Sequence, residues 1–175
     1  MNSHTVQRIR FAEKEAQKLL DLYWNRRIPV DPFRIAELLG LVSREEEMAQ
    51  SLYGRLDKRR YATVSVTVNA SLSPQNKRYC GAYFLGMFVL NTMLKHEMTY
   101  SRSLSRGLTP DPDYLFAHQF AQALLMPRSD FLAHLDAGRE MDQICETFDV
   151  TSMMAGWRMD SVGRADARKR LTAAV

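Results

Sequence analysis

The chain has 175 residues, of which 46% are hydrophobic and 25% charged, a balance typical of a globular protein with one sizeable core. No apolar run approaches the roughly 20 residues of a membrane span, and the N-terminal stretch lacks the uninterrupted apolar core of a signal peptide. We therefore expect a cytoplasmic protein that does not cross a membrane. The net charge of +4 is compatible with nucleic acid binding but does not by itself indicate it.

The N-terminal third predicts two helices followed by a β-hairpin. Apolar residues recur at helical spacing from Val6 to Trp24, and the segment PVDPFRIAELLG adds a second helix, capped by Asp31 and ended by Gly40. The acidic run Glu45–Glu47 is interpreted as a solvated linker. Beyond it, valines alternate with threonine and serine, which predicts two strands joined by a charged turn at residues 57–60.

The central part predicts a buried helix, a loop and a second helix. The stretch RYCGAYFLGMFVLNTMLK, residues 78–95, is apolar nearly all round, as expected of a helix at the centre of a core. The polar segment 99–113, with its prolines, predicts a loop, and Asp113 is the expected cap of the next helix, which stops at Pro127. A short helix over residues 129–135 follows.

The last segment has the spacing of a helix-turn-helix pair. An apolar stripe ending at Phe148, a turn at residues 149–150 and a helix that carries Trp157 give this pattern. A basic tail, GRADARKR, occupies residues 163–170. Such a pair either binds DNA or packs as an ordinary helical hairpin. Trp157 and the neighbouring methionines favour packing, because these side chains read base edges poorly.

The two cysteines and the standard catalytic motifs give no sign of an enzyme. Cys80 and Cys145 lie far apart, each within an apolar helical pattern, which favours free thiols over a disulfide. The sequence has no CxxC pair, and it lacks the GxSxG, P-loop, GxGxxG and paired-carboxylate patterns. We therefore expect neither a thiolate zinc site nor one of these common chemistries.

Taken in order, these segments resemble the ImmA/IrrE family of zincin-type metallopeptidases over nearly the whole chain. The family's PVDPxxIAExLG segment stands here as PVDPFRIAELLG, its ANxFAxxLLMP helix as AHQFAQALLMP, and its FxVSxxAxxxRL core as FDVTSMMAGWRM. The pair Tyr53-Gly54 matches a glycine-containing strand of the family, and Asn69 ends a strand in VN. We expect an α+β fold: a small antiparallel sheet on a mostly helical zincin-like core, residues 1–137, then a helix-turn-helix-like subdomain, residues 138–175.

The family's zinc-binding helix reads RFTxAHELGH and falls on residues 78–87. Its aromatic, small and Leu-Gly positions are kept, but its chemical positions are not. The resemblance places Tyr83 and Met87 where two histidines bind zinc, Phe84 where a glutamate activates the bound water, and Tyr114 at the third ligand. A phenol seldom ligates zinc, a thioether is too soft, and a phenyl ring accepts no proton. We therefore expect no metal, no cofactor and no peptidase activity, with packed side chains in place of the site.

Two histidines offer a rival metal site. The segment KHEMTY contains His96 and Glu97, but Tyr100 stands where a second histidine would be needed. His118, at the family's asparagine position, is the remaining partner for His96 in a makeshift site. Both histidines are expected instead at the surface or at helix ends.

Two functions remain open from the sequence. The resemblance implies that the partner is a helix-turn-helix repressor of the kind that family members cleave or inactivate in bacterial mobile elements or stress responses, and a pseudo-peptidase would bind it without cutting. The alternative is a DNA-binding transcriptional regulator that uses the C-terminal helices and the basic tail. Its expected phosphate contacts are five basic residues: Arg158, Arg164, Arg168, Lys169 and Arg170.

Overall fold

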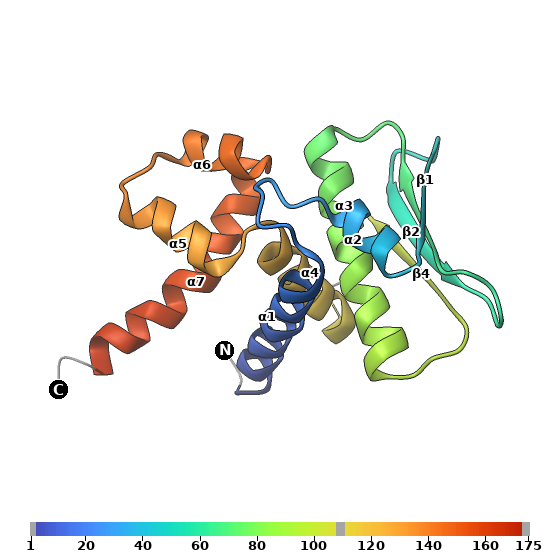
Figure 1. The fold of residues 1–175 in the computed structure, drawn as a ribbon, viewed down its shortest axis with the longest axis horizontal. Helices are drawn as coiled ribbons and strands as arrows, with labels where there is room; N and C mark the ends of the chain where they lie inside the picture. Colours follow the sequence, from blue (N-terminus) through green and yellow to red (C-terminus); the bar gives the residue numbers. More distant parts are fainter. Residues whose placement is uncertain (1–2, 108–110, 173–175) are drawn as a thin grey trace.

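The computed structural model describes residues 3–107 and 111–172, with side chains described for residues 10–107 and 111–163. The predicted α+β class is confirmed (Figure 1). The elements are α1 (Ser3–Tyr23), α2 (Pro32–Leu38), β1 (Val42–Glu46), β2 (Leu52–Lys58), β3 (Ser65–Asn69), α3 (Pro74–Phe88), the π-helical turn η1 (Val89–Leu94), β4 (Tyr100–Ser105), α4 (Pro112–Leu125), α5 (Arg128–Asp136), α6 (Met141–Phe148) and α7 (Ser152–Thr172).

The four strands form one mixed sheet in the order β1-β3-β2-β4. The predicted hairpin is present, because β2 pairs antiparallel with β3. Its connection covers residues 59–64, two residues later than the predicted turn at 57–60, because Asp57 and Lys58 belong to β2. Strand β1 runs parallel to β3, so the expectation of a purely antiparallel sheet was wrong. Asn69 at the end of β3 is buried, and its amide nitrogen donates to the backbone oxygens of Met48, Ala49 and Leu52.

Two segments predicted as loops are strands. Glu45 and Glu46 belong to β1 rather than to a linker, and the segment 99–113 contains β4. Neither strand carries a clear alternating pattern, since most of the β1 side chains are exposed and only Tyr100 and Leu104 are buried in β4. Backbone pairing with β3 and β2 therefore holds these strands in place, and that pairing has no local signature in the sequence.

Helix α3 is the centre of the core. Figure 1 shows it between the sheet on one side and α1 and α4 on the other, and every residue from Tyr79 to Phe88 is buried. Its approach to α4 is close, because a Cβ atom added to Gly86 would lie 3.0 Å from the Cβ of Phe120. The predicted long helix does not stay α-helical to its end. It continues as η1, where buried Asn91 donates to the backbone oxygen of Met87 at 2.6 Å.

Helix caps confirm most of the predicted boundaries. Asp31 accepts hydrogen bonds from the backbone of Phe33 and Arg34 at the start of α2. Helix α4 begins two residues earlier than predicted: its cap is Asp111, which accepts from the Tyr114 backbone at 2.7 Å, rather than Asp113. Pro112 explains the difference, since proline suits the first position of a helix.

The three C-terminal helices pack as a group beside the core (Figure 1). Asp149 ends α6 in the left-handed conformation and accepts a hydrogen bond from Gln75 of α3 at 2.8 Å. The turn predicted at residues 149–150 is therefore present. A boundary between a peptidase-like domain and a subdomain at residue 137 remains a proposal.

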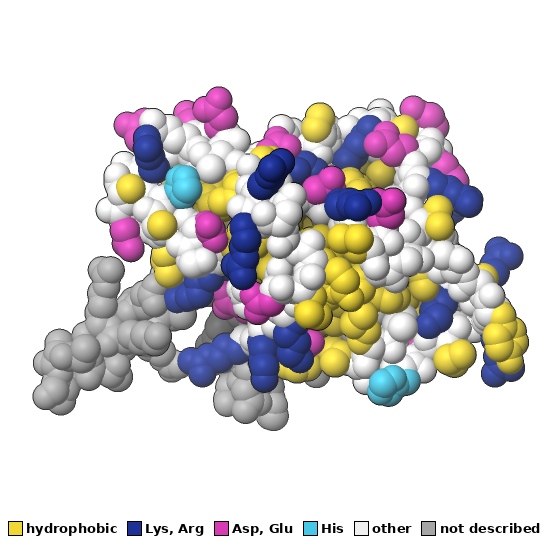
Figure 2. Space-filling model, viewed as in Figure 1, with side chains coloured by type: hydrophobic (Ala, Val, Ile, Leu, Met, Phe, Trp, Pro, Cys, Tyr) yellow, Lys and Arg dark blue, Asp and Glu magenta, His cyan; other side chains and the backbone are white. Residues whose placement is uncertain are grey.

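Two features concern the hydrophobic character of the helices and of the surface. Within the described ranges, no helix combines the length and apolar character needed to cross a bilayer. Figure 2 shows hydrophobic side chains gathered on one face beside α1. Among the residues whose side chains are described, the large hydrophobic ones exposed on α1, η1 and α4 are Phe11, Leu22, Met93, Leu94 and Leu115.

Candidate functional site

The three candidate positions on α3 are packed inside the protein. Tyr83 and Met87 are 2% and 3% exposed, and Phe84 is fully buried. The ring of Tyr83 lies 5.4 Å from that of Phe84 and 5.9 Å from that of Tyr114, measured between centroids. The structure therefore brings Tyr83, Phe84 and Tyr114 into one aromatic cluster, and it buries Met87 one turn further along the same helix.

The sheet closes over Phe84, the residue that the resemblance places at the family's general base. A Cβ atom on Gly54 of β2 would lie 2.8 Å from the Phe84 ring and 2.5 Å from the backbone oxygen of Thr67. Only glycine therefore lets β2 pass so close to Phe84. A phenyl ring with no space around it leaves no room for a metal-bound water at this point.

The side chains at the four positions do not fit a zinc ion. Burial, followed by the nearby Tyr114, raises the pKa of Tyr83, so its phenol stays protonated and is a poor ligand. Among the described residues, no group of three or more His, Cys, Asp or Glu side chains is arranged to hold a metal ion. The makeshift pairing of His96 with His118 gains no support from this arrangement.

The two histidines lie in different environments. His96 is exposed just after η1, in agreement with the expectation. The expectation was wrong for His118, which lies within α4 and packs edge-on against Trp157 with 4.6 Å between ring centroids. Its Nδ1 atom is 2.5 Å from the Tyr79 hydroxyl and its Nε2 atom is 2.7 Å from Gln122. Burial lowers the pKa of His118 to about 4, so the imidazole is neutral at pH 7.

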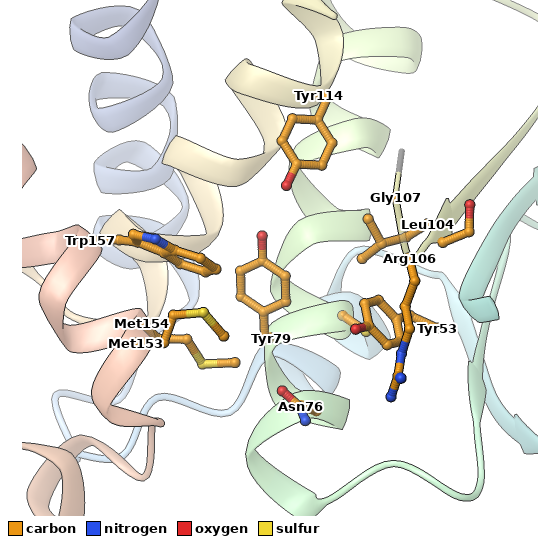
Figure 3. Close-up of a pocket in the computed structure, with 12 residues that line it drawn as sticks. Tyr53, Asn76, Tyr79, Leu104, Arg106, Gly107, Tyr114, Met153, Met154 and Trp157 are labelled. Atoms are coloured by element: carbon orange, nitrogen blue, oxygen red, sulfur yellow. The ribbon is translucent and has the colours of Figure 1, made fainter. Parts of the chain in front are cut away.

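A pocket of about 240 Å³ opens beside this cluster (Figure 3). Its aromatic walls come from β2, α3, α4 and α7, and they are Tyr53, Tyr79, Tyr114 and Trp157. The thioethers of Met153 and Met154 add to the α7 side, while Asn76 and Arg106 are its main polar groups. The sequence contains no sign of this pocket, because Tyr53 and Arg106 come together only through the pairing of β2 with β4.

The predicted free cysteines are confirmed, and neither has the character of a nucleophile. Cys80 is buried at the pocket wall, and burial raises the pKa of its thiol to about 12. Burial also raises the pKa of Cys145, which is half-buried. Both therefore remain thiols at neutral pH, whereas catalytic cysteines react as thiolates.

Arg158 is not available to DNA. It is 2% exposed and donates to the backbone oxygen of Met126 at 3.0 Å and to the Glu13 carboxylate at 2.9 Å. The prediction that this residue contacts phosphates is therefore wrong, because its charge pairs inside the protein. The side chains of Arg164, Arg168, Lys169 and Arg170 lie outside the described residues.

Helices α3 and α4 and the mixed sheet form an α+β core consistent with a zincin-like domain. A model of the peptidase family described as the IrrE N-terminal-like domain matches residues 36–160, and this chain belongs to that family. A solved structure described as a Mycobacterium tuberculosis transcriptional regulator is similar in fold, with a TM-score of 0.55 and 16% sequence identity. The match covers 85% of this chain and 45% of that one, and no curated protein matches the sequence.

Proposed function

We propose that this chain is a non-catalytic member of the family that acts by binding a protein. The observation that carries this proposal is the burial of Tyr83, Phe84 and Met87 at the positions of two zinc ligands and a general base. A peptidase of this class needs imidazole and carboxylate groups that face an open metal position. Here the same positions hold rings and a thioether packed against the sheet and α4, an arrangement that stabilises a core.

The proposed partner is a helix-turn-helix repressor, as the family resemblance implies, and the proposed role is regulatory. The similarity in fold to a transcriptional regulator is in keeping with that role. Two surface features support a docking site for the partner close to the pocket beside Tyr79. Strand β4 lies at one edge of the sheet, where backbone groups can pair with an extended segment of a partner. Met153 beside the pocket is 59% exposed, although it is apolar.

DNA binding through the C-terminal helices is the weaker candidate. Burial of Arg158 removes one of the five contacts expected with DNA phosphates. Trp157 packs on Tyr79 and His118, so much of its ring is already in contact with the protein. The DNA hypothesis now depends on the basic tail. A gel shift at two salt concentrations tests it, because phosphate contacts weaken steeply as salt rises.

The proposal is tested by mixing the purified chain with candidate helix-turn-helix repressors, starting with any that a neighbouring gene encodes. We expect a stable complex by light scattering and an intact repressor by mass spectrometry, with or without added zinc. Met153→Asp should weaken the complex. Met98→Asp, which changes a methionine of similar exposure (54%) away from the pocket, should leave it unchanged. Cleavage of the repressor that stops on addition of a chelator would overturn the proposal.

A further inference from the structure

We infer that the pocket beside Tyr79 binds a small planar aromatic carboxylate. This inference concerns a small molecule and does not depend on the partner proposed above. It follows from three properties of the pocket: aromatic walls on several sides, a rim with a guanidinium and an amide but no acidic side chain among the twelve described residues that line it, and a volume that suits a compact molecule.

The walls favour a flat ring. Figure 3 shows the Tyr79 ring between Trp157 and Tyr53, with Tyr114 beyond the Tyr79 hydroxyl. Rings attract one another in stacked or edge-on arrangements, and thioether sulfur adds favourable contacts at ring edges. Met153 and Met154 supply such sulfur atoms from α7. A saturated ring of the same size would fill the space without these contacts.

The walls are also held in place before any ligand arrives. Tyr79 is fixed by His118, whose other ring nitrogen lies beside Gln122, and Trp157 packs on both Tyr79 and His118. Tyr114 stacks on His118 with 10° between the ring planes. A pocket whose walls are already ordered loses little side-chain entropy on binding, which favours a small ligand with few contacts.

The rim favours a negative charge. Arg106 is the charged residue among the twelve that line the pocket, and its guanidinium lies 5.8 Å from the centre of the Tyr53 ring. Figure 3 shows the Arg106 and Asn76 side chains on the same side of the pocket. A carboxylate there would accept hydrogen bonds from a guanidinium and an amide, while an ammonium would meet only like charge.

The volume limits the ligand to one or two fused rings. A pocket of about 240 Å³ is just below the roughly 300–1,000 Å³ of sites for drug-sized molecules. An indole or phenyl ring with one carboxylate is small enough for a pocket of this volume. Larger nucleotides or lipids do not.

The experiment is a calorimetric titration of the full chain with indole-3-carboxylate and its matched neutral and saturated relatives, indole-3-carboxamide and cyclohexanecarboxylate. We expect the dissociation constant of indole-3-carboxylate to be about threefold to tenfold lower than that of either relative. Arg106→Gln should abolish the preference over the carboxamide. Arg34→Gln, which changes an exposed arginine on α2 paired with Glu37, should leave it unchanged.

A fluorescence titration locates the ligand. Trp157 lines the pocket and Trp24 does not, so a Trp24→Phe chain reports on the pocket alone. We expect its emission to change with the same dissociation constant as the heat signal. No saturable signal up to about 1 mM carboxylate, or equal binding of the acid and the amide by the unaltered chain, would overturn the inference. Thermal melts of each variant ensure that loss of binding is not loss of fold.

Discussion

Two neighbouring stretches of α3 differ sharply in how their surroundings are filled. Tyr83, Phe84 and Met87 are packed by the sheet and by α4, and none of these three residues is more than 3% exposed. About one turn earlier, Tyr79 and Cys80 border a pocket of about 240 Å³. One face of the helix is therefore closed by packing at Tyr83, Phe84 and Met87, while the turn before it borders an open pocket.

The largest change in stability is expected when the buried ring of Phe84 is removed. Phe84→Ala should lower the free energy of unfolding by about 3–5 kcal/mol, because it removes a fully buried ring and leaves a cavity under β2. Tyr61→Ala is the control, since Tyr61 is 93% exposed, and its effect should stay within about 0.5 kcal/mol. Urea titration measures both. Similar losses for the two variants would mean that Phe84 is not part of the core.

Acid should lower the free energy of unfolding through protonation of His118, the buried histidine beside the pocket. The pKa of His118 is lowered from 6.5 to about 4 by burial, so between these values the unfolded chain binds more protons than the folded one. Stability should therefore fall as the pH drops from 6.5 to 4, by at most about 3 kcal/mol. His118→Asn should remove this part of the pH dependence, whereas His96→Asn, at an exposed site, should not. An unchanged profile in His118→Asn would contradict the assignment.

Two glycines should respond with opposite signs. A Cβ atom on Gly86 meets Phe120 and Ala117 at 3.0 and 3.1 Å, so Gly86→Ala should cost about 1–2 kcal/mol after the gain in helix propensity. Gly156 in α7 has nothing within 4 Å of such an atom, and Gly156→Ala should stabilise the protein by up to about 1 kcal/mol. Thermal unfolding of the two variants compares them directly. Stabilisation by both would mean that α3 and α4 are less tightly packed than described.

The smallest effect is expected from the hydroxyl of Tyr83. In the described part of the chain this hydroxyl has no hydrogen-bond partner, and burial raises its pKa. Tyr83→Phe should therefore change the unfolding free energy by less than about 0.5 kcal/mol, because no hydrogen bond is lost. A zinc ligand would behave differently, since its removal would lower metal content and stability together.

The sequence was a good guide where a residue's role is local. Asp31 as a cap, the buried valines of the hairpin and the apolar helix around Phe84 could all be assigned from neighbours in the chain. Prediction failed where long-range pairing decides. Strand β4 shows too little alternation to be recognised, and His118 was placed at the surface because its contact with Trp157 joins residues 39 positions apart. Arg158 was assigned to DNA because its pairing with Glu13 spans nearly the whole chain.

If Tyr83, Phe84, Met87 and Tyr114 have replaced a zinc site by packed side chains, the purified chain should bind no zinc there, and its zinc content measures this. After equilibrium dialysis against zinc, followed by mass spectrometric metal analysis, we expect far less than one zinc ion per chain and an unfolding temperature that does not respond to a chelator. One bound zinc ion per chain that is lost in Tyr114→Phe or Met87→Leu would contradict the account.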